Sequence, residues 1–363
     1  MTAGFFSPLP PAPTGIADYS AALLDAMRAG GDLRVNVPGD IDLYHLGNNP
    51  LHAEIYRRAL RTPGVAVLHD AVLHHFMLGV LDRRAYTGEF VFNYGEWSRA
   101  LAEDLWRERS RAAHDPRYFE YALVKRIAEA SRAVVVHNPG AAAIVARHAP
   151  AARVVEIPHL FAAPALPEAG AIQRWREAHG LSPRTFLFGV FGYLREAKRL
   201  PAILRAFGRV REAGCDAALL VAGRFGSESF QRSLAPLLEA PGVLRAGYAP
   251  EREFWLMASA VDACVSLRYP SAGETSGITV RLMGLGKPVL VTAGEETALL
   301  PETACLHVDA GVAEEAMLKD YMLWLASSPE AARQIGCRAA AHIKRYHSPA
   351  EAARRYWEVL CSC

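Results

Sequence analysis

The strongest constraint on the fold is a regular alternation of short apolar runs with longer amphipathic segments along the whole chain. The runs are rich in Val and Leu, whereas the segments between them have apolar residues at three- and four-residue spacing. This pattern is typical of parallel strands that helices cover on both faces. The runs lie at 4–10, 42–47, 65–69, 133–138, 153–159, 186–192, 217–223, 242–248, 262–269 and 288–294. The sequence therefore predicts an α/β architecture.

The alternation pauses once, between about 161 and 185, where Pro and Ala accumulate. A chain of 363 residues also exceeds the roughly 250–300 residues at which a single hydrophobic core stops growing. We therefore expect two doubly wound halves joined by a linker, with ligands at the carboxyl ends of the strands. After 312 the pattern becomes helical to the end of the chain.

Composition narrows the function classes. Forty Lys and Arg residues against 38 Asp and Glu residues give a formal charge of +2, too balanced for the basic footprint of a nucleic-acid-binding protein. No apolar run approaches the roughly 18 residues of a spanning helix, so any membrane contact would be peripheral. The six cysteines lack metal-ligand spacing, and the N-terminus lacks the basic region of a signal peptide. These features favour a cytoplasmic protein without a bound metal.

Two strand ends in the N-terminal half carry polar or glycine residues that burial alone does not require. Gly15 begins a helix after a proline-rich turn. Either its missing side chain lets the backbone approach a ligand phosphate, or the glycine only allows a tight turn. His69 and Asp70 end the run 65–69, with His74 just beyond. Either His69 and Asp70 line a ligand cleft, or His69 is a structural histidine with its hydrogen bonds satisfied inside the protein. The five-residue spacing of His69 and His74 does not suit a zinc site.

A third strand end is strongly basic. Gly192 ends the run 186–192, and Arg195, Lys198 and Arg199 crowd the turn before the next helix. Cations beside the positive end of a helix are unfavourable unless an anion lies between them. The turn therefore indicates a bound phosphate, with a solvated basic turn as the alternative.

The fourth strand end, "SAGETSGITVRLMGLGKPVLV", combines an acid with a helix start. Thr275, Ser276 and Gly277 offer hydroxyls and backbone amides, and Glu274 can accept hydrogen bonds from sugar hydroxyls. Phosphate on the amides and a polyol on the carboxylate would explain both features. The alternative is that Glu274 caps the helix.

In this order, these motifs resemble those of the retaining glycosyltransferases of the GT-B fold, in the large family that includes sucrose synthases and bacterial mannosyltransferases. The resemblance runs along nearly the whole chain, through the loop at Gly15, "HD" at His69, "IPH" at 157–159, "GYLREAKR" at 192–199, "VAGRFG" at 221–226 and "GETSG…GLGKPVLVT". It implies two Rossmann-like domains that face each other across a cleft. The implied domains are 1–165 for the acceptor and 166–345 for a nucleotide-sugar donor, with a C-terminal helix in 346–363 that crosses back to the first domain.

The resemblance also implies roles for individual residues. Lys198 falls on the phosphate-binding lysine, His69 on the histidine near the reacting centre, and Glu274 on the first acid of the family's Glu-x7-Glu motif; these three are the catalytic candidates. The donor-binding candidates are Gly15, Gly192, Arg195, Arg199, Gly223, Thr275, Ser276, Gly277 and Arg281. The acceptor-side candidates are Asp18, Asp70 and His74.

The chain departs from the family pattern at two positions. Tyr193 occupies the place of the usual basic residue after the glycine, so Arg195 or Arg199 would supply the second positive charge. The second acid of the motif is missing, because counting from Glu274 reaches Leu282 and aligning backward from Gly286 reaches Arg281. We expect Arg281 to make an unusual donor contact or an internal salt bridge.

The resemblance predicts a metal-independent transfer of a sugar from a nucleotide diphosphate to a glycan, lipid-linked sugar or metabolite, with retention at the anomeric carbon. Polysaccharide biosynthesis is one setting for such a reaction. Two alternatives stay open: a nucleotide-sugar epimerase of the same fold, and a catalytically silent relative that binds nucleotide or glycan as a partner subunit.

Overall fold

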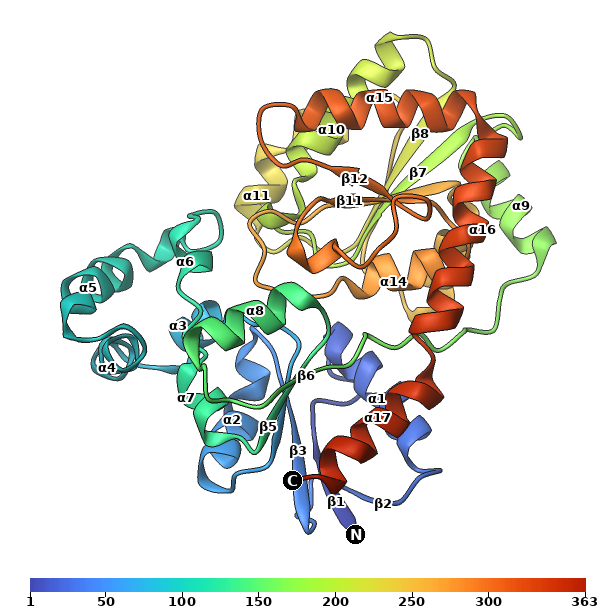
Figure 1. Cartoon of the computed structure of the whole chain (residues 1–363). Helices are drawn as coiled ribbons and strands as arrows, with labels where there is room; N and C mark the ends of the chain where they lie inside the picture. The colour runs from blue at the N-terminus through green and yellow to red at the C-terminus, as the bar shows by residue number, and fades with distance from the viewer.

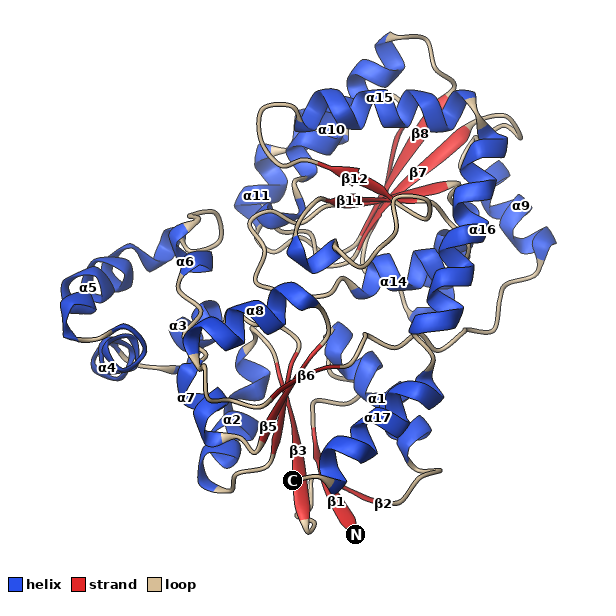
Figure 2. Ribbon diagram, in the orientation of Figure 1, coloured by secondary structure: helices blue, strands red, loops and turns tan.

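The computed structural model describes all 363 residues and contains two parallel sheets, one in each half of the chain. Both sheets have six strands, in the orders β2-β1-β3-β4-β5-β6 and β12-β11-β10-β7-β8-β9. The strands are β1 (Thr2–Phe6), β2 (Asp32–Val35), β3 (Ile41–Leu46), β4 (Val65–Leu68), β5 (Ala133–Val136), β6 (Val154–Glu156), β7 (Phe186–Phe191), β8 (Ala217–Ala222), β9 (Val243–Ala246), β10 (Ala263–Ser266), β11 (Val289–Thr292) and β12 (Leu306–Val308). Helices cover both sheets (Figures 1 and 2), which confirms the predicted α/β class.

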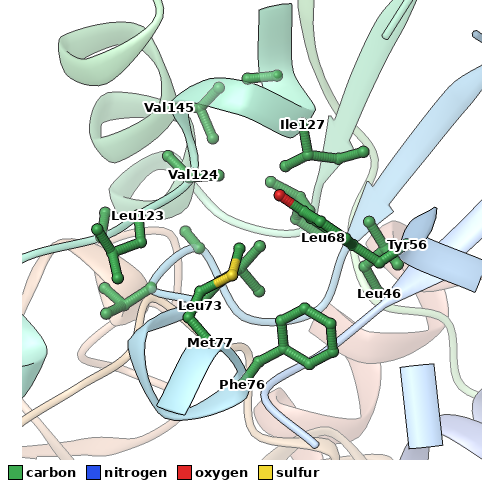
Figure 3. Packing of buried hydrophobic residues seen from close by; sticks show 14 of the residues in the cluster. Leu46, Tyr56, Leu68, Leu73, Phe76, Met77, Leu123, Val124, Ile127 and Val145 are labelled. Atoms are coloured by element: carbon green, nitrogen blue, oxygen red, sulfur yellow. The ribbon is translucent and has the colours of Figure 1, made fainter. Parts of the chain in front are cut away.

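The helices of the first half occupy the connections between its strands. They are α1 (Gly15–Met27), α2 (Ala53–Arg61), α3 (His74–Val80), α4 (Arg83–Tyr94), α5 (Arg99–Glu108), α6 (Arg117–Glu120), α7 (Lys125–Ala130) and α8 (Pro139–His148), with the 3₁₀ turns η1 (Pro50–His52), η2 (Glu96–Ser98) and η3 (Arg109–Arg111). Helices α4, α5 and α6 project away from the first sheet (Figure 1). Figure 3 shows the core that α2, α3, α7 and α8 form against this sheet, with Leu68, Phe76 and Ile127 among its buried residues.

The helices of the second half are longer towards the end of the chain. They are α9 (Ala169–Ala178), α10 (Leu200–Glu212), α11 (Glu228–Ser233), α12 (Ala235–Leu238), α13 (Glu251–Ala260), α14 (Gly277–Gly284), α15 (Glu314–Ser327), α16 (Pro329–Tyr346) and α17 (Pro349–Cys361), with the 3₁₀ turns η4 (Glu196–Lys198) and η5 (Glu295–Thr297). No helix is long and apolar enough to cross a membrane.

Strand order places a crevice at the carboxyl end of each sheet. After β1 and β2 the chain returns to the other side of β1 for β3, and after β7, β8 and β9 it returns to the other side of β7 for β10. Loops that leave neighbouring strands in opposite directions at such a switch point open a binding crevice. The crevice of the second sheet lies between the ends of β7 and β10.

Each predicted run overlaps a strand, but the sequence patterns missed β2 and β12. β2 is a half-exposed edge strand whose residues alternate between exposed and partly buried, so it carries no apolar run. β12 is only three residues long and lies at the edge of the second sheet. An edge strand is less buried than a central strand, so it lacks the continuous apolar run by which the central strands were predicted.

The last helix of the chain, α17, packs on α1 of the first half (Figure 1). Tyr356 and Leu360 of α17 are buried in the same core as Tyr19 and Leu23 of α1. The Tyr19 and Tyr356 hydroxyls lie 3.0 Å apart, and Trp357 Nε1 donates to the carbonyl of Met27. The first half therefore takes its final helix from the other end of the chain.

Candidate active site

Lys198 lies at the carboxyl end of β7, next to the first turn of α14. Its side chain is almost fully buried, and Nζ donates to the carbonyl of Phe191 at 2.7 Å. A Cβ built on Gly192 would lie 3.3 Å from Lys198 Nζ and 3.5 Å from Ile278 Cγ1, so these three residues meet at one point. Burial, and next the neighbouring Arg268 and Arg195, hold the pKa of Lys198 well below its usual value. A bound anion here would raise the pKa of Lys198, so the lysine would carry a full positive charge beside the anion.

Two glycines let the strand ends approach each other at this point. Gly192 has φ +99° and Gly223 has φ +148°, conformations that favour glycine. A Cβ on Gly223 would lie 1.8 Å from the Gly192 carbonyl oxygen, so any other residue there would push the ends of β7 and β8 apart. Both glycines therefore shape the crevice beside Lys198.

Two of the three cations in the basic turn are paired with protein carboxylates. Arg195 Nη2 lies 2.8 Å from Glu274 Oε1, and Arg199 makes a two-pronged contact with buried Glu314, with distances of 2.5–2.9 Å. The electrostatic argument from the sequence required an anion for this turn. The protein itself supplies that anion for Arg195 and Arg199, and Lys198 is the cation without a carboxylate partner.

Glu274 does not cap α14. Ser276 is the N-cap, and its Oγ accepts from the Thr279 amide at 3.2 Å. This arrangement leaves the amides of Gly277 and Ile278 without an acceptor inside the helix. The N-terminus of α14 therefore presents backbone donors on the side where Lys198 lies.

A buried charge cluster holds Glu274 in place. Its Oε1 accepts from Arg195 and from Arg268 Nη1 at 2.9 Å, and its Oε2 accepts from the Ala272 amide at 2.8 Å. Burial alone would raise the pKa of Glu274, but the Arg268 and Arg195 guanidiniums lower it to about 2. The carboxylate is therefore ionised across the physiological range.

The loop that carries Glu274 is hydrogen-bonded to the first half of the molecule. The Ala71 and Val72 amides both donate to the Ala272 carbonyl at 2.9 Å, directly after Asp70. Asn138 Nδ2 donates to the Gly273 carbonyl and to Thr275 Oγ1. The two halves are therefore in direct contact where their strand ends face each other.

Asp70 lies beside this contact. Its Oδ2 accepts from the Asn48 amide at 2.8 Å. Burial, and next the charge of Glu274, raise the pKa of Asp70 to about 6. The structure therefore brings Asp70 into the same charge cluster as Glu274, Arg195 and Arg268.

His69 belongs to a buried chain of three imidazoles. His45 Nδ1 lies 3.0 Å from His69 Nε2, His69 Nδ1 lies 3.3 Å from His137 Nε2, and His137 Nδ1 lies 2.9 Å from the Ile157 carbonyl. A carbonyl only accepts, so each ring carries its proton on Nδ1, and His137 and His69 accept on Nε2 while His45 Nε2 has no partner. Both ring nitrogens of His69 are thus engaged within the protein. Burial lowers the pKa of all three, that of His137 to about 4, so the chain is neutral.

Arg281 makes a salt bridge across the two halves. Its Nη2 lies 3.2 Å from Oδ2 of Asp18 on α1, and its guanidinium lies 5.5 Å from the ring centroids of Phe254 and Trp255. Gly15, one turn earlier on α1, faces open space. The expected salt bridge of Arg281 is therefore present, and its partner comes from the opposite half.

Reversing the charge of this pair should loosen the contact between the halves. The Arg281→Glu variant would place two carboxylates together, and because the Asp18 side chain is half exposed we expect a loss of about 1 kcal/mol or less. Small-angle X-ray scattering should give a larger radius of gyration for this variant and for Asp18→Arg, and the double reversal should restore it. The same reversal at Arg333 and Glu330, both on α16, is the control. Equal radii for all variants would contradict the prediction.

His74 lies apart from the other candidates. It is fully buried in the core of the first half, where Nε2 is 2.7 Å from the Tyr86 hydroxyl. Its ring packs against Tyr86, Phe90 and Tyr118, and its Nδ1 has no hydrogen-bond partner.

A cavity of about 740 Å³ opens between the two halves. Its walls come from 116–120, from the start of α8, from the loop after β10, from the segment after β11 and from the end of α16. Glu274, Thr275 and Ser276 line it, whereas Lys198, Arg195, Gly192 and His69 do not. The loop 271–276 therefore has its carboxylate and hydroxyls at the cavity.

The sequence patterns missed three residues that the structure places here: His137, Asn138 and Arg268. All three lie within two residues of a strand end, that of β5 in the case of His137 and Asn138, and that of β10 in the case of Arg268. The rule that ligands bind at strand ends would have found them. No group of three or more His, Cys, Asp or Glu side chains is arranged to hold a metal ion.

Sequence comparison finds no matching family model and no matching curated protein. Comparison with solved structures finds many similar chains. HepE from Anabaena, in complex with UDP and glucose, is 14% identical with a TM-score of 0.68, and all of both chains is covered. The sucrose-phosphate synthase of Thermosynechococcus elongatus is 15% identical with a TM-score of 0.71, covering 99% of this chain and 98% of the other. WaaG, a glycosyltransferase involved in lipopolysaccharide biosynthesis, is 13% identical with a TM-score of 0.62, covering 97% and 98%. The chain therefore has the GT-B fold of these proteins.

Proposed function

We propose that the protein is a retaining glycosyltransferase that moves a sugar from a nucleotide diphosphate to an acceptor, without a metal ion. The observation that carries the proposal is the meeting of Lys198, Gly192 and the first turn of α14 at the switch point of the second sheet. A buried cation without a carboxylate partner, beside free helix-start amides, suits a phosphate group. The shared fold supports the proposal, since one similar structure was solved in complex with UDP and glucose.

In this reaction the diphosphate leaves with the negative charge that develops on the bridging oxygen. Lys198 and the Gly277 and Ile278 amides would stabilise that charge, and the diphosphate would take the proton of the attacking hydroxyl on the same face of the sugar. Glu274, held ionised by Arg195 and Arg268, would accept hydrogen bonds from sugar hydroxyls. His69 would act by orienting the ring of His137, which lines the cavity.

A panel of nucleotides and nucleotide sugars tests the donor side. A ligand at 100 times its Kd stabilises the native state by about 2.7 kcal/mol, so the correct donor should raise the melting temperature clearly. NMR of the product should then give the same anomeric configuration as the donor. An inverted product would contradict retention, and the absence of any thermal shift would contradict the transferase proposal.

A second candidate function is nucleotide-sugar binding without transfer, as a partner subunit. One observation favours it: Glu274 already has two guanidinium partners, and Arg281 pairs with Asp18 at the position where the family has an acid. Slow hydrolysis of the bound donor in water distinguishes the two. A transferase should release free sugar over hours, whereas a binding subunit should leave the donor intact.

A further inference from the structure

The 740 Å³ cavity between the two halves has a negative lining. Its charged side chains are one arginine, Arg268, and three glutamates, Glu120, Glu274 and Glu296. Arg268 is paired with Glu274, and Arg195 approaches the same carboxylate from outside the cavity. Glu120 and Glu296 have no ion-pair partner. Two carboxylates therefore face the cavity without compensation.

The histidines in the lining do not offset this charge at neutral pH. Burial lowers the pKa of His137 and of His347 to about 4, and it also lowers the pKa of His342. All three rings are therefore neutral when the surrounding solution is near pH 7. An anionic ligand would meet like charges and no free cation, which is unfavourable in a partly enclosed site.

The hydrogen-bonding groups of the lining are also unevenly distributed. The ring nitrogens of His137 are used by His69 and Ile157, and the Asn138 amide is used by Gly273 and Thr275. The Glu120 and Glu296 carboxylates only accept, whereas the hydroxyls of Tyr269, Thr275 and Tyr346 can donate or accept. Arg268 Nε is the buried donor in the wall that lacks a protein acceptor, and one hydroxyl oxygen of a ligand would satisfy it. The lining therefore suits a ligand rich in O–H or N–H donors.

The rest of the wall is apolar or aromatic. Phe119, Leu299 and Tyr346 contribute exposed or half-exposed faces, and the buried residues Val280 and Val291 also line the cavity. Apolar walls with a few placed polar groups are typical of small-molecule sites of this volume. A sugar or cyclitol ring presents C–H faces to such walls and hydroxyls to the carboxylates.

We propose that this cavity is the acceptor site and that it takes a polyhydroxylated acceptor without a negative charge, an amino group being favoured and a phosphate rejected. The inference rests on the proposed transferase function. Glu274 lines the cavity, so the donor sugar would reach its inner end. The acceptor oxygen would bond to the anomeric carbon as the bond from that carbon to the diphosphate breaks, and the acceptor proton would pass to the diphosphate.

Three matched probes test the charge preference: glucosamine, N-acetylglucosamine and glucosamine 6-phosphate. Ligand-observed NMR on the full chain, saturated with UDP at pH 7.5, should give a Kd for glucosamine at least about tenfold below that for the 6-phosphate. N-acetylglucosamine should lie between them. The Glu120→Gln and Glu296→Gln variants should each reduce the ratio to about threefold, because each removes one uncompensated charge. Glu212→Gln, on the exposed end of α10 and far from the cavity in sequence, should leave the ratio unchanged.

Equal or tighter binding of the 6-phosphate would overturn the inference, as would a ratio that neither cavity variant changes. Failure of all three probes to bind while UDP still raises the melting temperature would also overturn it, and the transferase proposal would stand. Absence of a thermal shift with UDP and with every other nucleotide would instead overturn the transferase proposal, and the acceptor site with it.

Discussion

The Lys198→Ala variant is expected to lose transfer activity by a factor of about 10² to 10³ while keeping its fold. A preorganised donor aimed at a developing charge is worth about that much in other enzymes. Lys198 is the buried cation beside the α14 amides that has no carboxylate partner, so no protein anion neutralises its charge. Initial rates with the identified donor measure the effect, and circular dichroism checks the fold.

Lys287 offers a matched control. It too is a lysine with a lowered pKa, due mainly to burial, and its Nζ donates to the Ser259 carbonyl at 2.8 Å. Lys287→Ala removes a comparable ammonium–carbonyl bond far from the α14 N-terminus, so it should lower stability and leave the rate per folded molecule unchanged. Equal losses of activity in the two variants would mean that Lys198 acts through stability alone.

Acidification from pH 7.5 to pH 5 is expected to destabilise the protein by several kcal/mol. Burial lowers the pKa of His52, His137 and His347 to about 4, against about 6.5 in an unfolded chain. Between these values the unfolded state binds more protons, so stability falls as pH falls through this window. Each histidine should cost about 2 kcal/mol at pH 5. Asp70 acts in the opposite direction, because its pKa is raised to about 6.

The midpoint of urea unfolding, followed by tryptophan fluorescence at both pH values, measures this loss. His52→Gln keeps an amide that can donate to the His45 carbonyl and removes one titrating group, so its midpoint should fall less on acidification. His179→Gln, at an exposed position, should behave as the parent protein does. Identical pH dependence in the parent protein and the His52 variant would contradict the assignment.

Much of the fold was predictable because central parallel strands are buried on both faces. The run "FLFGVF" of β7 has no exposed residue, and no amphipathic helix gives such a pattern. Strand β2 was missed because its residues are at most partly buried, and β12 was missed because it is only three residues long. The strand-end rule also located Lys198, Glu274 and His69, since His69 ends a run and the other two lie in the loops that follow runs.

The partners of those residues could not be predicted, because they come from distant parts of the chain. The sequence showed that Glu274 is a carboxylate at a strand end, but its partner Arg195 lies 79 residues away in the sequence. Asp18 and Arg281 are 263 residues apart and meet only when the two halves face each other. Residue type and spacing indicate where polar chemistry gathers, and tertiary structure decides which of those groups remain free for a ligand.

The return of α17 to α1 has a consequence for how the protein is made. A ribosome releases residues 1–165 long before residues 349–361, yet Tyr356 and Leu360 complete the core in which Tyr19 and Leu23 are buried. During synthesis the face of α1 that α17 will cover therefore stays exposed to water until α17 has been made. The second half can fold in the meantime. The half of the molecule that emerges first is the last to be completed.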